Sequence, residues 1–138
     1  MTVNPTAGSL ARLKDTFPKD TPLVMINLLR FREQALYPRG SSFDGCSGRQ
    51  AYKRYMETAM DKLSEVGGRP VWMSKAFVSV IAPEDEQWDQ IFLVRYPSVD
   101  AFMTMISMPD YLAATVHREA ALRDSRLIAT MEIVSELG

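Results

Sequence analysis

The chain contains very few of the residues that build metal centres and disulfides. Among its 138 residues there is one cysteine, Cys46, and one histidine, His117. A single cysteine cannot form a disulfide within the chain, as is typical of proteins from a reducing compartment. Transition-metal sites usually need clusters of cysteine and histidine, and no DxD or ExxH pattern marks a carboxylate site. The sequence therefore predicts no metal and no cofactor held by metal ligands.

Long apolar runs and a large charge of one sign are also missing. The longest apolar stretch begins at Leu23 and is interrupted by Asn27, whereas a membrane helix needs about 20 apolar residues. Lys plus Arg total 16 and Asp plus Glu total 17, so the net charge is -1. No positive field therefore attracts nucleic acid or an anionic membrane. Because the N-terminus also lacks the apolar segment of a secretory signal, we expect a cytoplasmic protein.

The composition is that of an ordinary globular domain, with 46% hydrophobic and 24% charged residues. The length suits one domain. We expect residues 1–21 to form a mobile tail and a short helix capped by Ser9, and residues 22–138 to form a single domain.

Periodicity and turn residues divide that domain into strands and helices. Ser47 and Gln50 fit a capping box at the start of a helix that ends at Gly67 and Gly68, and Pro109 splits a second helical region. Residues 33–47 lack periodicity and predict a long, mobile loop that could act as a lid. The predicted strands are residues 23–31, 71–81, 88–96 and 126–134.

The resulting order is β-α-β-β-α-β, which predicts an α+β, ferredoxin-like fold. It would have a four-stranded antiparallel sheet with helices on one face and a split second helix. The first and third strands are apolar on both sides, although the uncovered face of such a sheet is normally polar and exposed to water. We expect a second copy to cover that face in a homodimer. The alternative is a monomer whose N-terminal helix covers it.

Five stretches together resemble the bacterial domain-of-unknown-function family numbered 1330. They are PLVMINLLRF, SGRQAYKRYMETAM, EVGGRPVW, APEDEQWDQIFLVRYPSVDAF and PDYLAATVHREAALRDSRLIAT, within residues 22–130. The resemblance implies membership of the dimeric α/β-barrel superfamily, which includes cofactor-free monooxygenases and isomerase-like enzymes. It implies no specific activity, since a fold is not a function.

Two residues are candidates for catalysis. His117 is the side chain that titrates near neutral pH, and alanines on its helical face would let the imidazole approach the sheet and meet Asn27 or Tyr55. Asn27 is polar within the most apolar strand and could bind a carbonyl or enolate oxygen. The structural alternatives are a histidine bonded to a backbone carbonyl or to Asp124, and an asparagine bonded to a loop or a dimer partner.

Four further residues are candidates for substrate binding: Tyr55, Trp72, Arg30 and Arg95. The aromatic pair could form walls, and the arginines could clamp a carboxylate. Alternatively the aromatics are core and the arginines pair with acids at the sheet rim.

Three hypotheses about function remain open. The first is a cofactor-independent monooxygenase- or isomerase-like enzyme acting on a small apolar or aromatic metabolite, with His117 as the base. The second is a non-catalytic small-molecule-binding protein with the same pocket. The third is a structural homodimer with a filled core.

Overall fold

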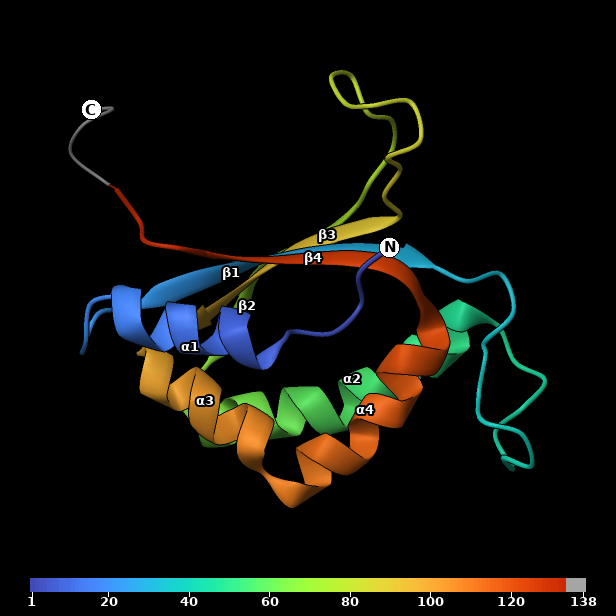
Figure 1. Cartoon of the computed structure of the whole chain (residues 1–138), viewed down its shortest axis with the longest axis horizontal. Coiled ribbons are helices and arrows are strands. Elements are labelled where there is room, and N and C mark those ends of the chain that lie inside the picture. The colour runs from blue at the N-terminus through green and yellow to red at the C-terminus, as the bar shows by residue number, and fades with distance from the viewer. Residues whose placement is uncertain (134–138) are drawn as a thin grey trace.

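The computed structural model describes residues 1–133 and has the predicted α+β, ferredoxin-like architecture (Figure 1). The sheet has the order β2-β3-β1-β4 with antiparallel neighbours, and the helices all lie against one of its faces. β1 and β3 are central, as predicted. The elements are α1 (Ala7–Thr16), β1 (Leu23–Phe31), α2 (Gly48–Glu65), β2 (Arg69–Lys75), β3 (Gln90–Tyr96), α3 (Val99–Ser107), α4 (Pro109–Ala121) and β4 (Leu122–Thr130).

Helix α2 begins and ends where the sequence predicts. The Ser47 hydroxyl accepts from the Gln50 amide at 3.1 Å, and the Gln50 side chain accepts from the Ser47 amide at 2.8 Å. This reciprocal box satisfies two amides that the first helical turn leaves free. At the other end Gly67 has a φ of +81°, the left-handed conformation that terminates a helix. Gly48 is packed so closely that a Cβ would lie 2.1 Å from the Arg32 carbonyl oxygen.

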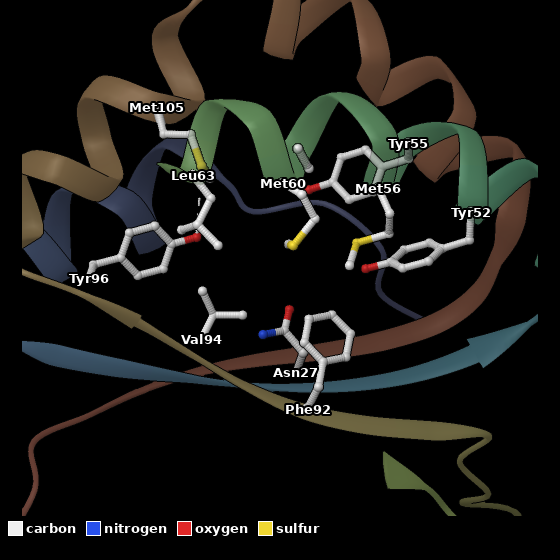
Figure 2. A pocket seen from close by; sticks show the side chains of 11 residues that line it. Asn27, Tyr52, Tyr55, Met56, Met60, Leu63, Phe92, Val94, Tyr96 and Met105 are labelled. Carbon is white, nitrogen blue, oxygen red and sulfur yellow. Dashed lines mark hydrogen bonds between the residues drawn. The ribbon is translucent and has the colours of Figure 1, made fainter. Parts of the chain in front are cut away.

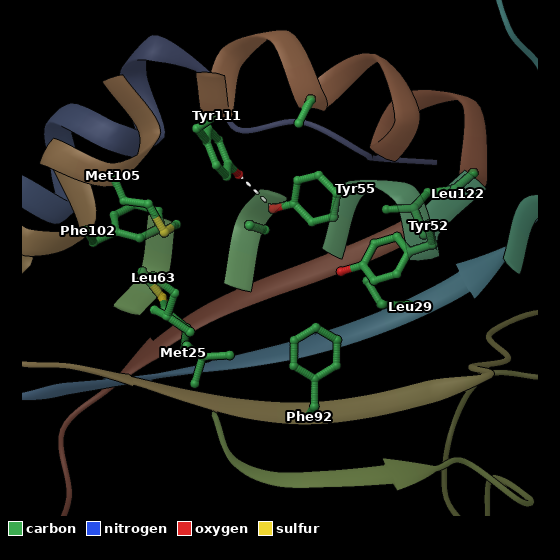
Figure 3. Close-up of a cluster of buried hydrophobic side chains, with 14 of the residues drawn as sticks. Met25, Leu29, Tyr52, Tyr55, Leu63, Phe92, Phe102, Met105, Tyr111 and Leu122 are labelled. Carbon is green, nitrogen blue, oxygen red and sulfur yellow. Dashed lines mark hydrogen bonds between the residues drawn. The ribbon is translucent and has the colours of Figure 1, made fainter. Parts of the chain in front are cut away.

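The core lies between the sheet and the helices (Figure 3). Alternate residues of β1 and β3 point to the helices and are buried, among them Leu29 and Phe92, and α2 presents Tyr52, Tyr55 and Leu63 to them. Helix α1 packs against this same core through Leu10, Leu13 and Phe17. The alternative in which the N-terminal helix covers the free sheet face is therefore wrong.

The N-terminal segment differs from its prediction. The helix α1 is capped by Thr6, and Ser9 is the third helical residue that completes the box. The residues before it are not a free tail, because the Thr2 carbonyl accepts from the Ser125 amide at 2.7 Å and its amide donates to Asp124 at 3.0 Å. The N-terminus is thus held at the edge of β4.

The strand ends also differ from the prediction. β2 stops at Lys75 and not at residue 81, because its neighbour β3 begins only at Gln90 and leaves residues 76–89 as a projecting arm. β4 is shifted toward the N-terminus and runs alongside β1 to Thr130. The predicted end of the last strand at Val134 lies outside the described residues.

The loop of residues 33–47 is irregular, as predicted, yet it is tied to its surroundings. The Ala35 amide donates to the Cys46 carbonyl at 2.9 Å, and the Leu36 amide donates to the Ala120 carbonyl at 2.8 Å. Ala35 and Tyr37 are buried. Within residues 1–133, no helix combines the length and the apolar character that a membrane crossing requires.

The sheet face opposite the helices carries no other element of residues 1–133 (Figure 1). We call it the outer face. Its side chains come from alternate strand positions, and residues directly opposite each other on neighbouring strands share a face. The apolar members are Val24, Ile26, Leu28, Trp72, Ile91, Leu93 and Ile128.

Candidate functional site between helix α2 and the sheet

A cavity lies between α2 and the helix-facing side of β1 and β3 (Figure 2). Its volume of about 40 Å³ is room for about three water molecules. It is lined by Asn27, Tyr52, Tyr55, Met56, Ala59, Met60, Leu63, Phe92, Val94, Tyr96 and Met105. Three of these are methionines, whose unbranched side chains adapt readily to different shapes. The methionine side chains can therefore adjust their shape to a guest.

Asn27 supplies an amide to this otherwise apolar space. Its Nδ2 donates to the Met25 carbonyl at 3.3 Å, a long bond, and its Oδ1 points toward Met56 and Met60 on α2. No hydrogen bond to Oδ1 is formed within residues 1–133. Asn27 is half-buried, and this oxygen is a free acceptor aimed into the cavity.

The cavity also contains phenol hydroxyls that stay protonated. Tyr52 and Tyr96 point their hydroxyls inward from opposite ends in Figure 2. Burial raises the pKa of Tyr52 and of Tyr96 well beyond the ordinary value for a phenol. The Tyr96 hydroxyl lies 4.0 Å from the Met105 sulfur, so it is a weakly engaged donor. The cavity thus offers hydrogen-bond donors and an amide, with no ionised side chain along its lining.

Tyr55 is held in place by a second tyrosine. Its hydroxyl lies 2.8 Å from that of Tyr111 on α4 (Figure 3), and burial raises the pKa of Tyr55 strongly. The ring forms part of the cavity wall, as the prediction for a substrate-binding Tyr55 requires. Its hydroxyl is engaged with Tyr111, so its contribution to a ligand is apolar contact.

His117 lies elsewhere, in a cluster between α4 and the 33–47 loop. Its Nδ1 lies 2.8 Å from the Tyr37 hydroxyl, and its ring meets that of Phe43 edge-on with centroids 4.7 Å apart. Arg54 donates to the Tyr37 hydroxyl at 3.2 Å and contacts the Cys46 sulfur at 3.3 Å. The prediction that the imidazole points to the sheet, where Asn27 or Tyr55 would meet it, is wrong.

The hydrogen bonds of this cluster suit a neutral histidine. Arg54 donates to the Tyr37 oxygen, and the Tyr37 hydroxyl proton can then donate to Nδ1 of His117. Burial, followed by the charge of Arg54, lowers the pKa of His117 below 6.5. The imidazole is therefore neutral near pH 7 and accepts a hydrogen bond that links the 33–47 loop to helix α4.

The remaining predicted residues lie on the outer face, away from the cavity. Arg95 is opposite Val24 and Arg69, Arg30 is opposite Asp124, and Trp72 is opposite Leu93. Trp72 is 53% exposed. The sequence alternative pairs Arg30 and Arg95 with acids at the sheet rim, Glu33 or Asp124, but Asp124 instead accepts from Arg126 at 2.7 Å. The structure thus brings Asn27 and Tyr55 together and separates them from His117, Arg30, Arg95 and Trp72.

Some residues of the two sites can be found from the sequence and others cannot. Tyr52 and Met56 can be found, because they lie one helical turn from Tyr55 and Ala59 on the same face of α2. Tyr37 and Phe43 could not, since the loop has no period and Tyr37 is 80 residues from His117 in the chain.

Fold and cavity define this protein as a small ferredoxin-like domain with a mainly apolar pocket between sheet and helices. The chain belongs to the family described as a domain of unknown function, DUF1330, whose model matches residues 46–131. This confirms the predicted family, although the match begins later than the predicted residue 22. None of the curated proteins compared with the chain matches it.

Solved structures extend this likeness to nearly the whole chain. The methylated RPA0582 protein is 36% identical to this chain. The match covers 98% of this chain and 97% of that chain, with a TM-score of 0.90. The RPA0582 protein of unknown function from Rhodopseudomonas palustris is 36% identical over 96% of this chain and 97% of that chain, with a TM-score of 0.87. A ferredoxin-like dabb family protein from Mesorhizobium loti is 13% identical over 82% and 98%, with a TM-score of 0.48.

Proposed function

We propose that this protein binds a small, uncharged, mainly apolar molecule in the cavity between α2 and the sheet. The observation that carries the proposal is the free Oδ1 of Asn27 within an apolar wall that also offers the Tyr52 hydroxyl. Ligand sites typically combine such apolar walls with a few polar groups that fix orientation. An ionised ligand does not fit, because no charged side chain lines the cavity to compensate for its desolvation.

A hydroxyl group of the guest can donate a hydrogen bond to Oδ1 of Asn27 and accept one from the Tyr52 hydroxyl. The Tyr52 hydroxyl and the second N–H of the Asn27 amide would also favour an enolate or phenolate oxygen, which is the feature that a cofactor-independent monooxygenase- or isomerase-like enzyme needs. Catalysis is therefore the second candidate. Proton removal by His117 is not part of it, because the imidazole is bonded to Tyr37 outside the cavity. We assign His117 to holding the 33–47 loop on α4.

The experiment compares cyclohexanol with cyclohexane, which have similar shape and differ by one hydroxyl group. The methyl resonances of Met56 and Met60 report binding by NMR titration. We expect both probes to shift these methyls, with cyclohexanol binding about 10-fold more tightly. In Asn27→Leu the preference should shrink to about twofold. Unchanged cavity methyls at millimolar concentrations of both probes would show that the cavity is not a binding site.

We further propose that the protein is a homodimer joined through the outer face. The central strands present Val24, Ile26, Leu28 and Leu93 on that face, and the helices of residues 1–133 all pack on the other side. Burying this apolar strip against its own copy removes it from water. Light scattering at micromolar concentration should give twice the 15.6 kDa mass of one chain, and a mass of one chain would refute the dimer.

A further inference from the structure

The arm of residues 76–89 rises from the sheet on the side away from the helices (Figure 1). Its base is fixed in three ways. The Ala76 amide donates to the Asp89 carbonyl at 3.0 Å. Glu86 lies 3.7 Å from Arg126 on β4, and the guanidinium of Arg126 stacks 5.0 Å from the centre of the Trp88 ring. The arm therefore leaves the sheet in a defined direction.

The first half of the arm is apolar and uncovered. Phe77 is 93% exposed, Val80 is 89% exposed and Ile81 is 96% exposed. Val78 between them is 74% exposed. Within residues 1–133, residues 77–82 form no backbone or side-chain hydrogen bond. Large apolar patches of this kind are rare on monomers and mark surfaces that another molecule covers.

The apolar and β-branched residues of this segment explain why the sequence predicts a strand to residue 81. Apolar side chains recur as in β2, but β3 begins too late to pair with them. The segment thus has the composition of a buried strand without the neighbour that would bury it. Residues 1–133 of this copy do not supply the missing surface.

A second copy supplies a surface of the right character and position. The arm projects on the side of the outer face, so one face-to-face pairing covers the apolar strip and the arm together. From residue 76 to residue 83 the arm can extend about 23 Å at roughly 3.3 Å per residue. That is longer than the roughly 17 Å from Gln90 to Arg95 along β3, so the arm can span the partner's sheet.

Charge indicates which end of the partner the arm tip reaches. Glu84 and Asp85 at the tip form no salt bridge within residues 1–133. Arg69 and Arg95 are paired directly across β2 and β3, at the end of the sheet away from the arm, and no carboxylate within residues 1–133 bridges to either. Two like charges facing each other on one sheet face repel, and an acidic tip would relieve that repulsion.

We propose that the arms are exchanged between two copies: residues 77–81 of each copy pack on the outer face of the other, and the acidic tip lies against Arg69 and Arg95. This inference rests on the proposed homodimer. It adds that the arm supplies much of the binding free energy and fixes the relative direction of the two sheets.

The first test replaces two exposed arm residues, in the variant Phe77→Asp with Ile81→Asp. These side chains touch little in a single copy, so the variant should fold normally by circular dichroism. The control is Leu112→Asp on α4, which replaces a half-exposed leucine on the helix side. We expect sedimentation analysis to show the dimer dissociation constant raised at least 100-fold in the arm variant. The control should match the wild type.

The outcomes separate the arm from the dimer. A wild-type chain that is monomeric at micromolar concentration would overturn both proposals. A wild-type dimer whose dissociation constant is unchanged in the arm variant would overturn arm exchange and leave the homodimer standing.

A second test locates the arm on the partner. A photo-crosslinking residue at position 77 in isotopically light protein is mixed with heavy protein and irradiated. We expect light-to-heavy crosslinks on β1 or β3 of the second copy, whereas crosslinks only within one chain would contradict the proposal.

A third test reverses the charges at the tip. Glu84→Arg with Asp85→Arg should weaken the dimer about 10-fold, and adding Arg69→Glu with Arg95→Glu should restore it. Failure of that restoration would refute the placement of the tip.

Discussion

At the scale of single residues, Asn27 lowers the stability of the fold and has a proposed role in ligand binding. Its amide lies among apolar side chains and makes one long hydrogen bond, of 3.3 Å, to Met25. Leucine has a similar volume and needs no polar partner. We therefore expect Asn27→Leu to raise the free energy of unfolding by about 1 kcal/mol in urea titrations.

The matched variant Asn27→Asp should have the opposite effect. It keeps the shape of the side chain but places a carboxylate in the cavity, where no cation compensates for lost hydration. We expect about 1–3 kcal/mol of destabilisation at pH 7. If Asn27→Leu instead destabilised the protein by more than 1 kcal/mol, the amide would be a structural requirement and the proposed ligand role would lose its basis.

His117 predicts how stability changes with pH. Burial and the Arg54 charge lower its pKa below 6.5 in the folded state, so the unfolded chain binds the proton more tightly. The stabilisation from the neutral imidazole is complete above about pH 6.5 and is lost as the pH falls through the lower, folded-state pKa. Urea unfolding between pH 7 and pH 5 should show this loss, and His117→Gln should flatten it.

Asp124 changes stability only at lower pH, so it does not contribute to the loss of stability between pH 7 and pH 5. Burial disfavours its charged form, but hydrogen bonds from the Thr2 amide and from Arg126 outweigh burial and lower its pKa below 3.8. Its contribution is complete above about pH 4 and is lost only at lower pH. An unchanged slope between pH 7 and pH 5 in His117→Gln would therefore contradict the assignment to His117.

Sequence reasoning located residues on their own elements better than it paired residues between elements. Asn27 and Tyr55 could be placed because a strand and a helix each fix which way successive side chains point. His117 could not, although Ala114 and Ala121 on its helix are indeed buried. The imidazole lies beside that face, and its partners come from an irregular loop whose path no local pattern specifies.

At the scale of elements, the start of α2 depends on the absence of a side chain at Gly48. A Cβ there would lie 2.1 Å from the Arg32 carbonyl oxygen and 2.7 Å from the Ala121 carbonyl oxygen, and both are backbone atoms that cannot rotate away. We expect Gly48→Ala to lower the free energy of unfolding by about 1–3 kcal/mol.

The control for that variant is Gly8→Ala in helix α1. Its Cβ would meet only the Thr6 hydroxyl oxygen, at 3.9 Å, and alanine favours helices by up to about 1 kcal/mol over glycine. Chemical denaturation should show no loss, or a small gain, for this variant. Equal losses in both variants would show that the effect comes from glycine's backbone freedom and not from the contact at Gly48.

The same contrast explains which element boundaries could be predicted. The ends of α2 depend on local chemistry, namely the Ser47 and Gln50 box and the positive φ of Gly67. The end of β2 depends on where its neighbour begins, and the apolar composition of residues 71–81 does not contain that information. Helix caps are local, whereas strand lengths are set by partners distant in the chain.

At the scale of the whole molecule, the outer face and the arm are left uncovered by residues 1–133. The sequence shows this in part, because the apolar residues on both sides of β1 and β3 already require a second covering layer. It does not show the arm, since the same residues predict an ordinary strand. Dimerisation therefore stays a prediction, and it makes thermal stability depend on protein concentration.

If folded copies pair and unfolded chains do not, mass action stabilises the native state as concentration rises. Calorimetry at about 1, 10 and 100 μM should show a melting temperature that increases at each step. Each tenfold step adds roughly 1.4 kcal/mol per mole of dimer, which is about 0.7 kcal/mol per chain. For a domain of this size that corresponds to about 2–4 °C.

The Phe77→Asp with Ile81→Asp variant should lose the concentration dependence of its melting temperature in this range if the arm holds the dimer together. A wild-type melting temperature independent of concentration would show that the outer face is exposed in the native protein.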